Sequence, residues 1–412
     1  MTGQPRLMGV DLTDPDSFVP GVPHETLTRL RQEDPIHWHP ELDGPGFWAV
    51  TRYDDVVEAN RDWETYSSER GAVHLWDLDP EALAQMIHIM LYMDPPRHTR
   101  HRLLVNKGFT PRMIGRLHEH IVELATGIVD EVIERGECDF VTDVAAELPL
   151  QVIAEMMGVP HEDRALVFDW SNRMVGSEDP EYAADPSEAQ SAQAELFAYA
   201  NDLAAEKRKH PDDDIVSTLL QAEVDGDRMS ELDFDLFFML LAVAGNETTR
   251  NLISNGLLAL FDHPDQHHRL AEDPALLDSG VEEMLRWGSV VMHFRRTATR
   301  DVVLREREIS EGDKVVLWYI SANRDEDVFD DPFAFRVDRS PNDHIAFGGG
   351  GPHFCLGANL ARAEIKVIFD EVLRRLPDIE PAGPVQRLRS NFINGIKHIP
   401  VRFTPGRRAL TS

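Results

Sequence analysis

Phe347-Gly-Gly-Gly-Gly-Pro-His-Phe-Cys355 is the most specific stretch of this sequence, and a helical pattern begins just after it. Cys355 is one of only two cysteines in 412 residues, so frequent use of thiols does not explain it. The N–H groups of a tight glycine loop and of a helix N-terminus lower the pKa of a thiol and stabilise a thiolate. An axial thiolate of this kind is what haem iron needs to cleave an O–O bond. The alternative is a buried free cysteine beside a flexible glycine loop.

The composition limits the class of protein. Hydrophobic residues make up 42% of the chain, and we find no internal repeat, low-complexity linker or break in composition. We therefore expect residues 1–412 to form a single large domain and a monomer. No run approaches about eighteen unbroken apolar residues, and the first residues lack the layout of a signal peptide, so we expect no membrane span. Two cysteines far apart in the sequence favour a reducing cytoplasm over a disulfide framework.

The charge is strongly acidic, with 41 basic against 73 acidic residues and a net charge of −32. This balance argues against nucleic-acid binding, and solubility alone explains it. Residues 97–116 are an exception, because they contain six basic residues and no acidic one: Arg97, Arg100, Arg102, Lys107, Arg112 and Arg116. Such a segment is a solvated helix face, a docking surface for an acidic protein, or a site that holds the carboxylates of a cofactor.

Residues 110–261 form an almost wholly helical pattern. Within it, residues 148–157 predict a buried helix that ends at Gly158, and the acidic, proline-containing residues 179–187 predict a mobile loop. Ser230 opens the longest helical pattern, which continues to about His263.

Short strands are predicted on both sides of this helical part. The first is entered from the turn at Gly44, before a helix that begins near Asp54, and two more at 302–304 and 314–319 are joined by an acidic turn. Asn394-Gly395 lies between apolar residues, which is typical of a hairpin turn. The predicted fold class is mainly α with small β-sheets, an α+β arrangement.

The long helical pattern carries polar residues at its centre, in Ala244-Gly245-Asn-Glu247-Thr248-Thr249. An acid and two hydroxyls there are costly unless they are satisfied. One interpretation is an exposed Glu247 and a Thr248 that bonds back to the carbonyl four residues earlier. Gly245 weakens that interpretation, because glycine inside a helix costs roughly 1 kcal/mol against alanine, and it suggests the close approach of something flat.

The pattern Phe347-Gly348-x-Gly350-x-x-His353-x-Cys355-x-Gly357 matches the haem-binding signature of cytochrome P-450, and the chain resembles this family along nearly its whole length. The resemblance implies the cytochrome P-450 fold, haem b with Cys355 as the axial iron ligand, and contacts to the haem from the loop glycines and Phe347. It also implies that residues 244–249 cross the haem face where dioxygen binds. Thr248 would hydrogen-bond the iron-bound peroxo group, Glu247 would feed protons from solvent, and Gly245 would approach the haem.

Four residues match the positions that hold the haem propionates in this family: His98, Arg102, Arg296 and His353. His98 and Arg102 are four residues apart and share a helix face. Arg295 precedes Arg296, and either of the two could point inward. The resemblance also identifies Glu283, Arg286 and Arg339 as a structural charge triad, although Glu283 and Arg286 alone read as a surface helix pair.

The resemblance places a set of basic residues on the cysteine side of the haem: Arg100, Lys107, Arg112, Arg116, Arg362 and Lys366. Complementarity then predicts an acidic iron–sulfur ferredoxin as electron donor, with its ferredoxin reductase. The chain has no flavin- or nicotinamide-binding fingerprint.

The predicted substrate pocket is apolar, which suits a hydrophobic substrate, although the same residues could simply form core. Its residues are Trp76, Met90, Val290, Val291, Met292, Phe294, Phe392 and Ile393. Several segments resemble bacterial enzymes that hydroxylate terminal carbons of methyl-branched lipids, terpenoids and sterol side chains. Val290 stands where the family often has a proline. The alternatives are a tailoring hydroxylase of a macrolide or polyketide, a peroxide-driven enzyme and a haem-based gas sensor, while one Cys and one His make a poor zinc site.

Overall fold

A computed structural model describes residues 10–109, 111–175, 179–182, 185, 187–224 and 227–409. Its helices are α1 (His24–Glu33), α2 (Tyr53–Arg61), α3 (Pro80–Met86), α4 (Arg97–Val105), α5 (Pro111–Ile133), α6 (Glu147–Met157), α7 (Arg164–Val175), α8 (Ser187–Lys209), α9 (Ile215–Gln221), α10 (Glu231–Asp262), α11 (Pro264–Glu272), α12 (Leu277–Gly288), α13 (Tyr319–Ala322) and α14 (Ala358–Arg375). Short 3₁₀ turns lie at Pro15–Phe18, Met90–Tyr92, Asn106–Phe109, His161–Asp163 and Pro274–Leu276, and a π-helix at Val141–Ala145. The predicted fold class, mainly α with small β-sheets, is confirmed.

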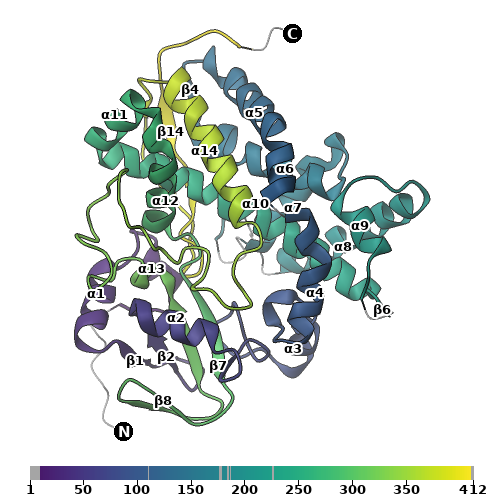
Figure 1. The fold of residues 1–412 in the computed structure, drawn as a ribbon, viewed down its shortest axis with the longest axis vertical. Helices are drawn as coiled ribbons and strands as arrows, with labels where there is room; N and C mark the ends of the chain where they lie inside the picture. The colour runs from purple at the N-terminus through teal and green to yellow at the C-terminus, as the bar shows by residue number, and fades with distance from the viewer. Residues whose placement is uncertain are drawn as a thin grey trace.

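The strands are short. They are β1 (Ile36–His39), β2 (Phe47–Val50), β3 (Tyr66–Ser67), β4 (Glu137–Asp139), β5 (Glu223–Val224), β6 (Asp227–Arg228), β7 (His293–Ala298), β8 (Val302–Leu304), β9 (Arg307–Ile309), β10 (Lys314–Trp318), β11 (Glu380–Pro381), β12 (Gln386–Arg387), β13 (Ile396–His398) and β14 (Pro400–Arg402). β1, β2, β7 and β8 lie together at one end of the molecule, whereas β4 and β14 lie toward the other end (Figure 1). The largest sheet has the order β1-β2-β10-β7-β3, with β2 and β10 parallel and the other pairs antiparallel.

The helix α10 crosses the middle of the molecule and organises the core (Figure 1). Ser230 caps it by accepting a hydrogen bond from the Asp233 N–H at 3.1 Å, and His263 follows its last residue, as the sequence predicted. α10 packs against α6, α7, α8, α12 and α14. Residues on all of its sides are buried because neighbouring helices surround it, and the largest hydrophobic cluster extends from it to α5, α6 and α14. Two smaller clusters cover the two faces of the five-stranded sheet.

Two predicted turns are different in the structure. The strand at 302–304 pairs with β9 in a hairpin of its own, so the acidic turn at 311–313 joins β9 to β10. Asn394-Gly395 does not form a two-residue hairpin turn, because β12 and β13 pair through Arg387 and Ile396 and leave a longer connection between them. Asn394 instead donates its N–H to the Val290 carbonyl at 2.8 Å, which ties this connection to the segment before β7.

The predicted mobile loop lies partly outside the described residues. In the part that is described, Asp179 is buried, 1% exposed, and its carboxylate accepts hydrogen bonds from the Lys397 ammonium at 3.0 Å and the Arg389 N–H at 2.9 Å. This end of the loop is therefore tethered to β13 and to the connection that precedes it.

Candidate functional site

The cysteine loop, residues 345–357, is a series of tight turns that ends where α14 begins. The Gly348 N–H donates to the Ile345 carbonyl at 2.9 Å, and the Cys355 N–H donates to the Phe347 carbonyl at 2.9 Å. Gly348, Gly350 and Gly351 have φ angles of 94°, 93° and 79°, in the region that favours glycine. The loop thus needs glycine for its backbone path.

Packing against α2 is a second reason for the glycines. A Cβ on Gly349 would approach the Val57 side chain at 3.0 Å, and one on Gly351 would lie 2.7 Å from the Asn60 carbonyl oxygen. The Asn60 side chain donates to the Gly350 carbonyl at 2.7 Å, and the Arg61 side chain donates to the Gly349 carbonyl at 2.9 Å. The last turn of α2 therefore fixes the cysteine loop from outside.

The environment of the Cys355 sulfur differs from the one the sequence predicted. Burial raises the pKa of the thiol, and it outweighs a hydrogen bond from the Gly357 N–H and the charges of Arg102 and Arg362, which lower it. Although the groups around the sulfur desolvate it, Cys355 keeps exposed surface. A Cβ built on Gly357, two residues after Cys355, would meet no atom within 4 Å, so the space at Gly357 is open.

The middle of α10 presents a small exposed surface inside a buried helix. Ala244 is exposed although Ala242 and Asn246 are 1% and 0% exposed. Thr248 lies one turn further on and is half-buried, and its Oγ1 donates to the Ala244 carbonyl at 2.8 Å. The back-bond considered for Thr248 from the sequence is therefore present. Gly245 meets α6 at this point, because a Cβ on it would lie 2.7 Å from the Ile153 side chain.

Glu247 points away from the exposed stripe of α10. It is 1% exposed, its carboxylate pairs with the Arg250 guanidinium, and Arg250 donates to the Asn172 side chain of α7 at 2.8 Å. Burial raises the pKa of Glu247, and Arg250 opposes the rise. The interpretation as a solvent-exposed Glu is wrong, and the structure brings Glu247 and Thr248 into no direct contact.

Four predicted residues form a cationic cluster whose charge comes from its two arginines, with His98 and Arg102 on α4, Arg296 on β7, and His353 in the cysteine loop. The rings of His98 and His353 lie 4.4 Å apart between centroids, and the Arg102 side chain donates to the Pro352 carbonyl at 3.2 Å. Burial and the charges of Arg102 and Arg296 lower the pKa of His98 to about 4. Arg296 is 3% exposed, and its hydrogen bonds go to the neutral Arg295 carbonyl and Asn60 side chain.

Arg295, the other arginine that could have pointed inward, has different hydrogen-bond partners. Its guanidinium donates to the Trp76 carbonyl at 2.8 Å and to the Asp77 carboxylate at 2.5 Å. Successive residues of a strand point to opposite faces, so the two arginines of β7 serve different sides of the sheet. The structure therefore groups Arg296, and not Arg295, with His98 and His353.

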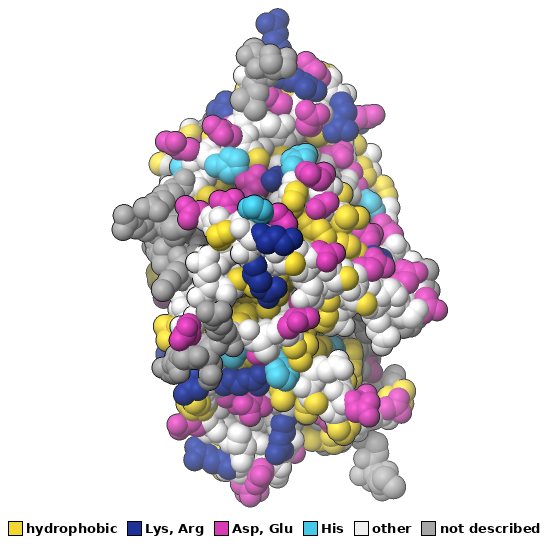
Figure 2. Space-filling model, turned by 90° about the vertical axis from the view of Figure 1, so that its right-hand side faces the viewer, with side chains coloured by type: hydrophobic (Ala, Val, Ile, Leu, Met, Phe, Trp, Pro, Cys, Tyr) yellow, Lys and Arg dark blue, Asp and Glu magenta, His cyan; other side chains and the backbone are white. Residues whose placement is uncertain are grey.

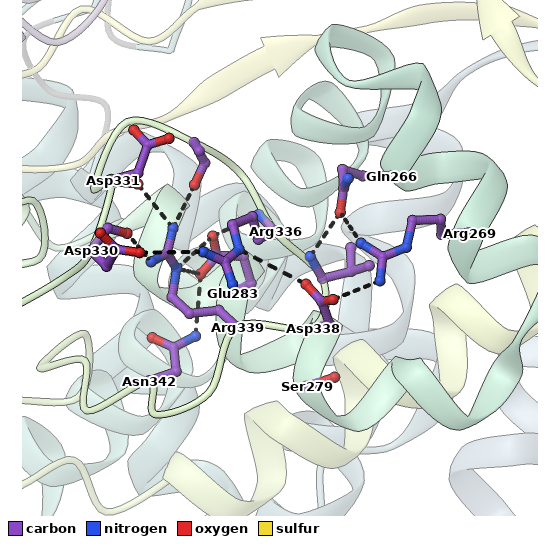
Figure 3. A network of polar contacts seen from close by, with 12 residues as sticks. Gln266, Arg269, Ser279, Glu283, Asp330, Asp331, Arg336, Asp338, Arg339 and Asn342 are labelled. Atoms are coloured by element: carbon purple, nitrogen blue, oxygen red, sulfur yellow. Dashed lines mark hydrogen bonds and ion pairs between the residues drawn. The ribbon is translucent and has the colours of Figure 1, made fainter.

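Glu283, Arg286 and Arg339 form a buried charge network. Figure 3 shows the part of it that joins Glu283 to Arg339 and Asn342. The Arg286 guanidinium makes two hydrogen bonds of 2.8 Å to the Glu283 carboxylate, and Arg339 Nε makes two of 3.1 Å. Glu283 also accepts from the Arg336 N–H at 2.9 Å and from the Asn342 side chain at 3.2 Å. Because Glu283 and Arg286 are 0% exposed, the surface-pair interpretation is wrong.

Residues 185–386 match the family model Cytochrome P450. The Steroid C26-monooxygenase of Mycobacterium tuberculosis is 45% identical over 406 residues, covering 96% of this chain and 93% of that protein. The Methyl-branched lipid omega-hydroxylase of the same species is 45% identical over 385 residues, covering 91% of this chain and 90% of that protein. The chain belongs to the cytochrome P450 family.

A solved structure agrees with this assignment over almost the whole molecule. The Mycobacterium marinum cytochrome P450 CYP268A2 in complex with pseudoionone superposes with a TM-score of 0.90 at 42% identity, covering 98% of this chain and 100% of that one. The protein is thus a cytochrome P450 monooxygenase that hydroxylates hydrophobic substrates, and like its family it uses a haem-thiolate cofactor, O2 and external redox partners.

The residues of this cytochrome P450 fit a haem. His98 Nδ1 is buried without a hydrogen-bond partner among the described residues, and Arg296 pairs with neutral acceptors only. A buried cationic cluster of this kind matches two carboxylates such as the haem propionates. Cys355 would supply the one thiolate that the family needs, and it keeps exposed surface where a haem could reach it.

The predicted pocket residues separate into two groups. Phe294 packs against Phe392 with ring centroids 5.7 Å apart, and Val291 forms a β-bridge with Ile393, so these four residues are brought together. Val290 is 3% exposed, and its carbonyl holds Asn394 in the same place.

The other pocket residues have different surroundings. Met292 packs with Phe18 and Trp318 in a cluster beneath the N-terminal segment, so the structure places it in the core. Met90 is 8% exposed and belongs to the large cluster around α10. Trp76 is 52% exposed and contacts the His74 ring at 5.0 Å.

The predicted docking residues are only partly described. Arg100 is exposed on α4, whereas the side chains of Lys107, Arg112 and Arg116 lie outside the described part of the chain. Arg362 donates to the Glu282 carboxylate at 2.6 and 2.9 Å, and Lys366 pairs with Asp278. Both residues of α14 therefore have acidic partners on α12, which the sequence did not suggest. Among the described helices, none has a stretch long and apolar enough to span a membrane.

Several residues that support the site were missed from the sequence. Ser68 Oγ lies 3.2 Å from His353 Nε2, and Asp94 accepts from the Ser68 N–H at 3.0 Å. Asn60 contacts both Arg296 and the cysteine loop. Only Asp94 carried a sequence signal, because it opens the Asp-Pro-Pro turn before His98. Ser68 and Asn60 lie far from any motif.

Proposed function

We propose that this cytochrome P450 carries haem b and inserts one oxygen atom from O2 into a C–H bond of a terpenoid, a sterol side chain or a methyl-branched lipid. The observation that carries the proposal is the apolar wall made by Phe294, Phe392, Val291 and Ile393. An apolar wall with few polar groups suits a hydrophobic substrate that is held by its shape. The activities named for the two mycobacterial relatives support the same substrate classes.

We propose that a second apolar cluster extends the wall. It contains Ala72, Ile89, Tyr92 and Leu236, and half-buried side chains that include Leu91 and Leu240 pack on it. Leu240 lies one helical turn before Ala244, so the same face of α10 leads from this cluster to Thr248. An elongated apolar substrate would lie along this face with its terminal carbon near Thr248.

In this proposal the Cys355 thiolate would bind the haem iron, and His98, Arg102, Arg296 and His353 would hold the two haem carboxylates. The haem supplies the activation of O2 and the oxidising equivalent for the C–H bond. Phe347, Gly348, Gly357 and Gly245 border it, and the triad of Glu283, Arg286 and Arg339 keeps the chain around the cysteine loop in place.

Proton delivery is assigned to Thr248 and Glu247. The Thr248 hydroxyl shares its proton with the Ala244 carbonyl and can turn about χ1 toward the exposed side of α10. Glu247 is turned toward Arg250, so its carboxyl must leave this partner before it can pass a proton on. The Thr248 hydroxyl is thus the proton donor at the site. Glu247 supplies protons to it after the Glu247 side chain has moved away from Arg250.

We also propose that residues 1–412 work as a single-domain monomer in the cytoplasm, with electrons from a ferredoxin and its ferredoxin reductase. Acidic side chains are spread over the face in Figure 2, and small groups of basic side chains lie between them. An acidic ferredoxin would need such a basic group, and Arg100 on α4 is the residue we assign to it first. The rate of reduction by an acidic [2Fe–2S] ferredoxin should fall with ionic strength.

Two measurements test the proposal. The spectrum of the reduced, carbon-monoxide-bound protein shows whether a thiolate binds the haem. Titration with a 3-keto steroid that has an intact side chain, a methyl-branched fatty acid and an acyclic terpenoid ketone, each followed by the low- to high-spin shift, identifies the class. A macrolide is the contrasting ligand. If the macrolide shifts the spectrum and none of the three lipids does, the proposed substrate classes are wrong.

A further inference from the structure

Asn60 stands between two parts of the haem site that come from distant segments. It is the second-to-last residue of α2 and is 2% exposed. Its Nδ2 donates to the Gly350 carbonyl of the cysteine loop at 2.7 Å. Its Oδ1 accepts from Arg296 Nη2 at 3.2 Å and from the Tyr319 hydroxyl at 2.9 Å. One amide therefore joins the loop of Cys355 to the arginine of the cationic cluster.

The three partners fix the orientation of this amide. Arg296 and the Tyr319 hydroxyl can both donate, so they face the carbonyl oxygen, and the Gly350 carbonyl can only accept, so it faces the NH2 group. A reversed amide would place its NH2 group against a guanidinium and its oxygen against a carbonyl. The arrangement uses both ends of the side chain in a buried place, where an unsatisfied polar group destabilises the fold.

Neutrality is the second property of Asn60 that matters. Arg296 has the carbonyl of Arg295 and the Asn60 oxygen as hydrogen-bond acceptors, and neither carries a charge. Burial lowers the pKa of Arg296. An aspartate at position 60 would have nearly the same shape, but it would pair with Arg296 directly and would have no N–H for Gly350. Asn60 thus orients Arg296 without neutralising it.

We propose that Asn60 is a positioning residue for the haem, which sets the Cys355 loop and the propionate-binding Arg296 at a fixed distance from each other. The inference rests on the proposed function, because it takes Cys355 and Arg296 as the two attachment points of the haem. Arg61 assists at the same loop through its hydrogen bond to the Gly349 carbonyl. Asn60 itself would touch neither the iron ligand nor the substrate.

The test compares the holoprotein with Asn60→Asp and Asn60→Ser. We expect haem transfer to apomyoglobin to be about tenfold faster in Asn60→Asp, because the new carboxylate would pair with Arg296 in place of a haem propionate. The hydrogen bond to a charged group that is lost contributes about 1.5 kcal/mol, which corresponds to that factor. The carbon-monoxide spectrum of the reduced variant should show a larger fraction without thiolate ligation. Asn60→Ser should show the same direction, because serine is too short to join Gly350 to Arg296.

Gln266→Glu is the matched control. Gln266 on α11 is a buried amide, 8% exposed, that accepts from the Val337 N–H at 3.1 Å and from Arg269 at 3.3 Å, and none of its hydrogen bonds within the described part of the chain goes to the cysteine loop. The Gln266→Glu variant should be less stable to urea but should keep the wild-type rate of haem transfer. If Asn60→Asp or, where that variant does not fold, Asn60→Ser transfers haem no faster than Gln266→Glu, Asn60 is only a buried core amide. A wild-type spectrum without thiolate ligation would overturn the proposed function instead.

Discussion

The carboxylate of Glu247 lies against the guanidinium of Arg250, one turn further along α10, and the two residues are 1% and 3% exposed. Arg250 in turn donates to Asn172 on α7 at 2.8 Å. The acid that we assign to proton supply is therefore held in a buried pair between two helices. Arg250 therefore affects both the charge of the Glu247 carboxyl and the direction in which the Glu247 side chain points.

Arg250→Gln should lower the free energy of unfolding by about 3–5 kcal/mol, since it leaves a buried carboxylate without its counter-charge. Glu247→Gln in the same chain should restore much of this loss, because no buried charge then remains. Urea unfolding of the two single variants and of the double variant measures the coupling. Glu33→Gln, at the exposed pair with Arg29, serves as control and should change stability by about 0.5 kcal/mol or less. Additive losses at 247 and 250 would contradict the buried pair.

The pH dependence of Arg250→Gln follows from the sign of the shift. Burial already raises the pKa of Glu247, and the loss of Arg250 removes the charge that opposes the rise. The unfolded state then releases its proton near the ordinary value of 4.5 while the folded state keeps it, so the variant should lose stability as the pH rises above 4.5. Urea midpoints of this variant between pH 5 and pH 8 should fall, and a flat profile would contradict the assignment.

Thr248→Ala should uncouple electron consumption from product formation. We propose its hydroxyl as the proton donor at the exposed stripe of α10, and general acid catalysis contributes about 10²-fold or more to a rate. We expect hydroxylated product per electron to fall steeply while hydrogen peroxide rises, and Thr248→Ser to retain most of the coupling. Thr218→Ala on α9 removes the same kind of back-bond, 2.9 Å to the Asp214 carbonyl, and should leave coupling unchanged. Full coupling in Thr248→Ala would remove this residue from the proton path.

Glu283→Ala should be among the most damaging substitutions in the chain. It leaves Arg286 and Arg339 buried with no carboxylate, a change that costs about 3–5 kcal/mol. The main-chain acceptors of Arg286, the carbonyls of Asn323 and Pro332 at 2.9 Å, cannot replace the lost charge. Circular dichroism and haem content of the purified variant measure the outcome. Wild-type stability would show that the network is dispensable.

The residues with motifs around them could be predicted from the sequence. The cysteine loop has its signature, and the caps and apolar pattern of α10 predicted its bounds at Ser230 and His263. Spacing also identified Glu283 and Arg286, although only the fold shows that they are buried. Local patterns are sufficient where a helix or a loop is specified by its own residues.

Directions and distant partners could not be predicted in this way. Glu247 and Thr248 are neighbours in the sequence, but successive residues of a helix point in different directions, and only Arg250 and Asn172 determine where Glu247 goes. The sequence predicted Met292 as a pocket residue together with Phe294, but Met292 packs with Phe18, which is far away in the sequence. Asn60 carries no pattern at all, because its role arises only when α2 meets the cysteine loop.

His398 should make the stability of the fold sensitive to pH. It lies between two carboxylates, with Nδ1 at Asp139 and Nε2 at 2.7 Å from Glu181. Burial opposes the charge on His398, but the hydrogen bonds to Glu181 and Asp139 outweigh it and raise the pKa above 6.5. A raised pKa means that the stabilisation is fully present below pH 6.5 and is lost as the pH rises through the higher, folded-state value.

Comparison of the wild type with His398→Asn tests this relationship. At pH 6 the wild type should be more stable to urea than the variant, and the difference should shrink toward pH 9 as the charge on His398 is lost. His267 on α11 provides a control of opposite sign, because burial lowers its pKa and the charged form is disfavoured in the folded state. The advantage of the wild type over His267→Gln should therefore grow as the pH rises from 5 to 7. If the stability difference between the wild type and His398→Asn is constant from pH 6 to pH 9, His398 is neutral where it contacts Asp139 and Glu181.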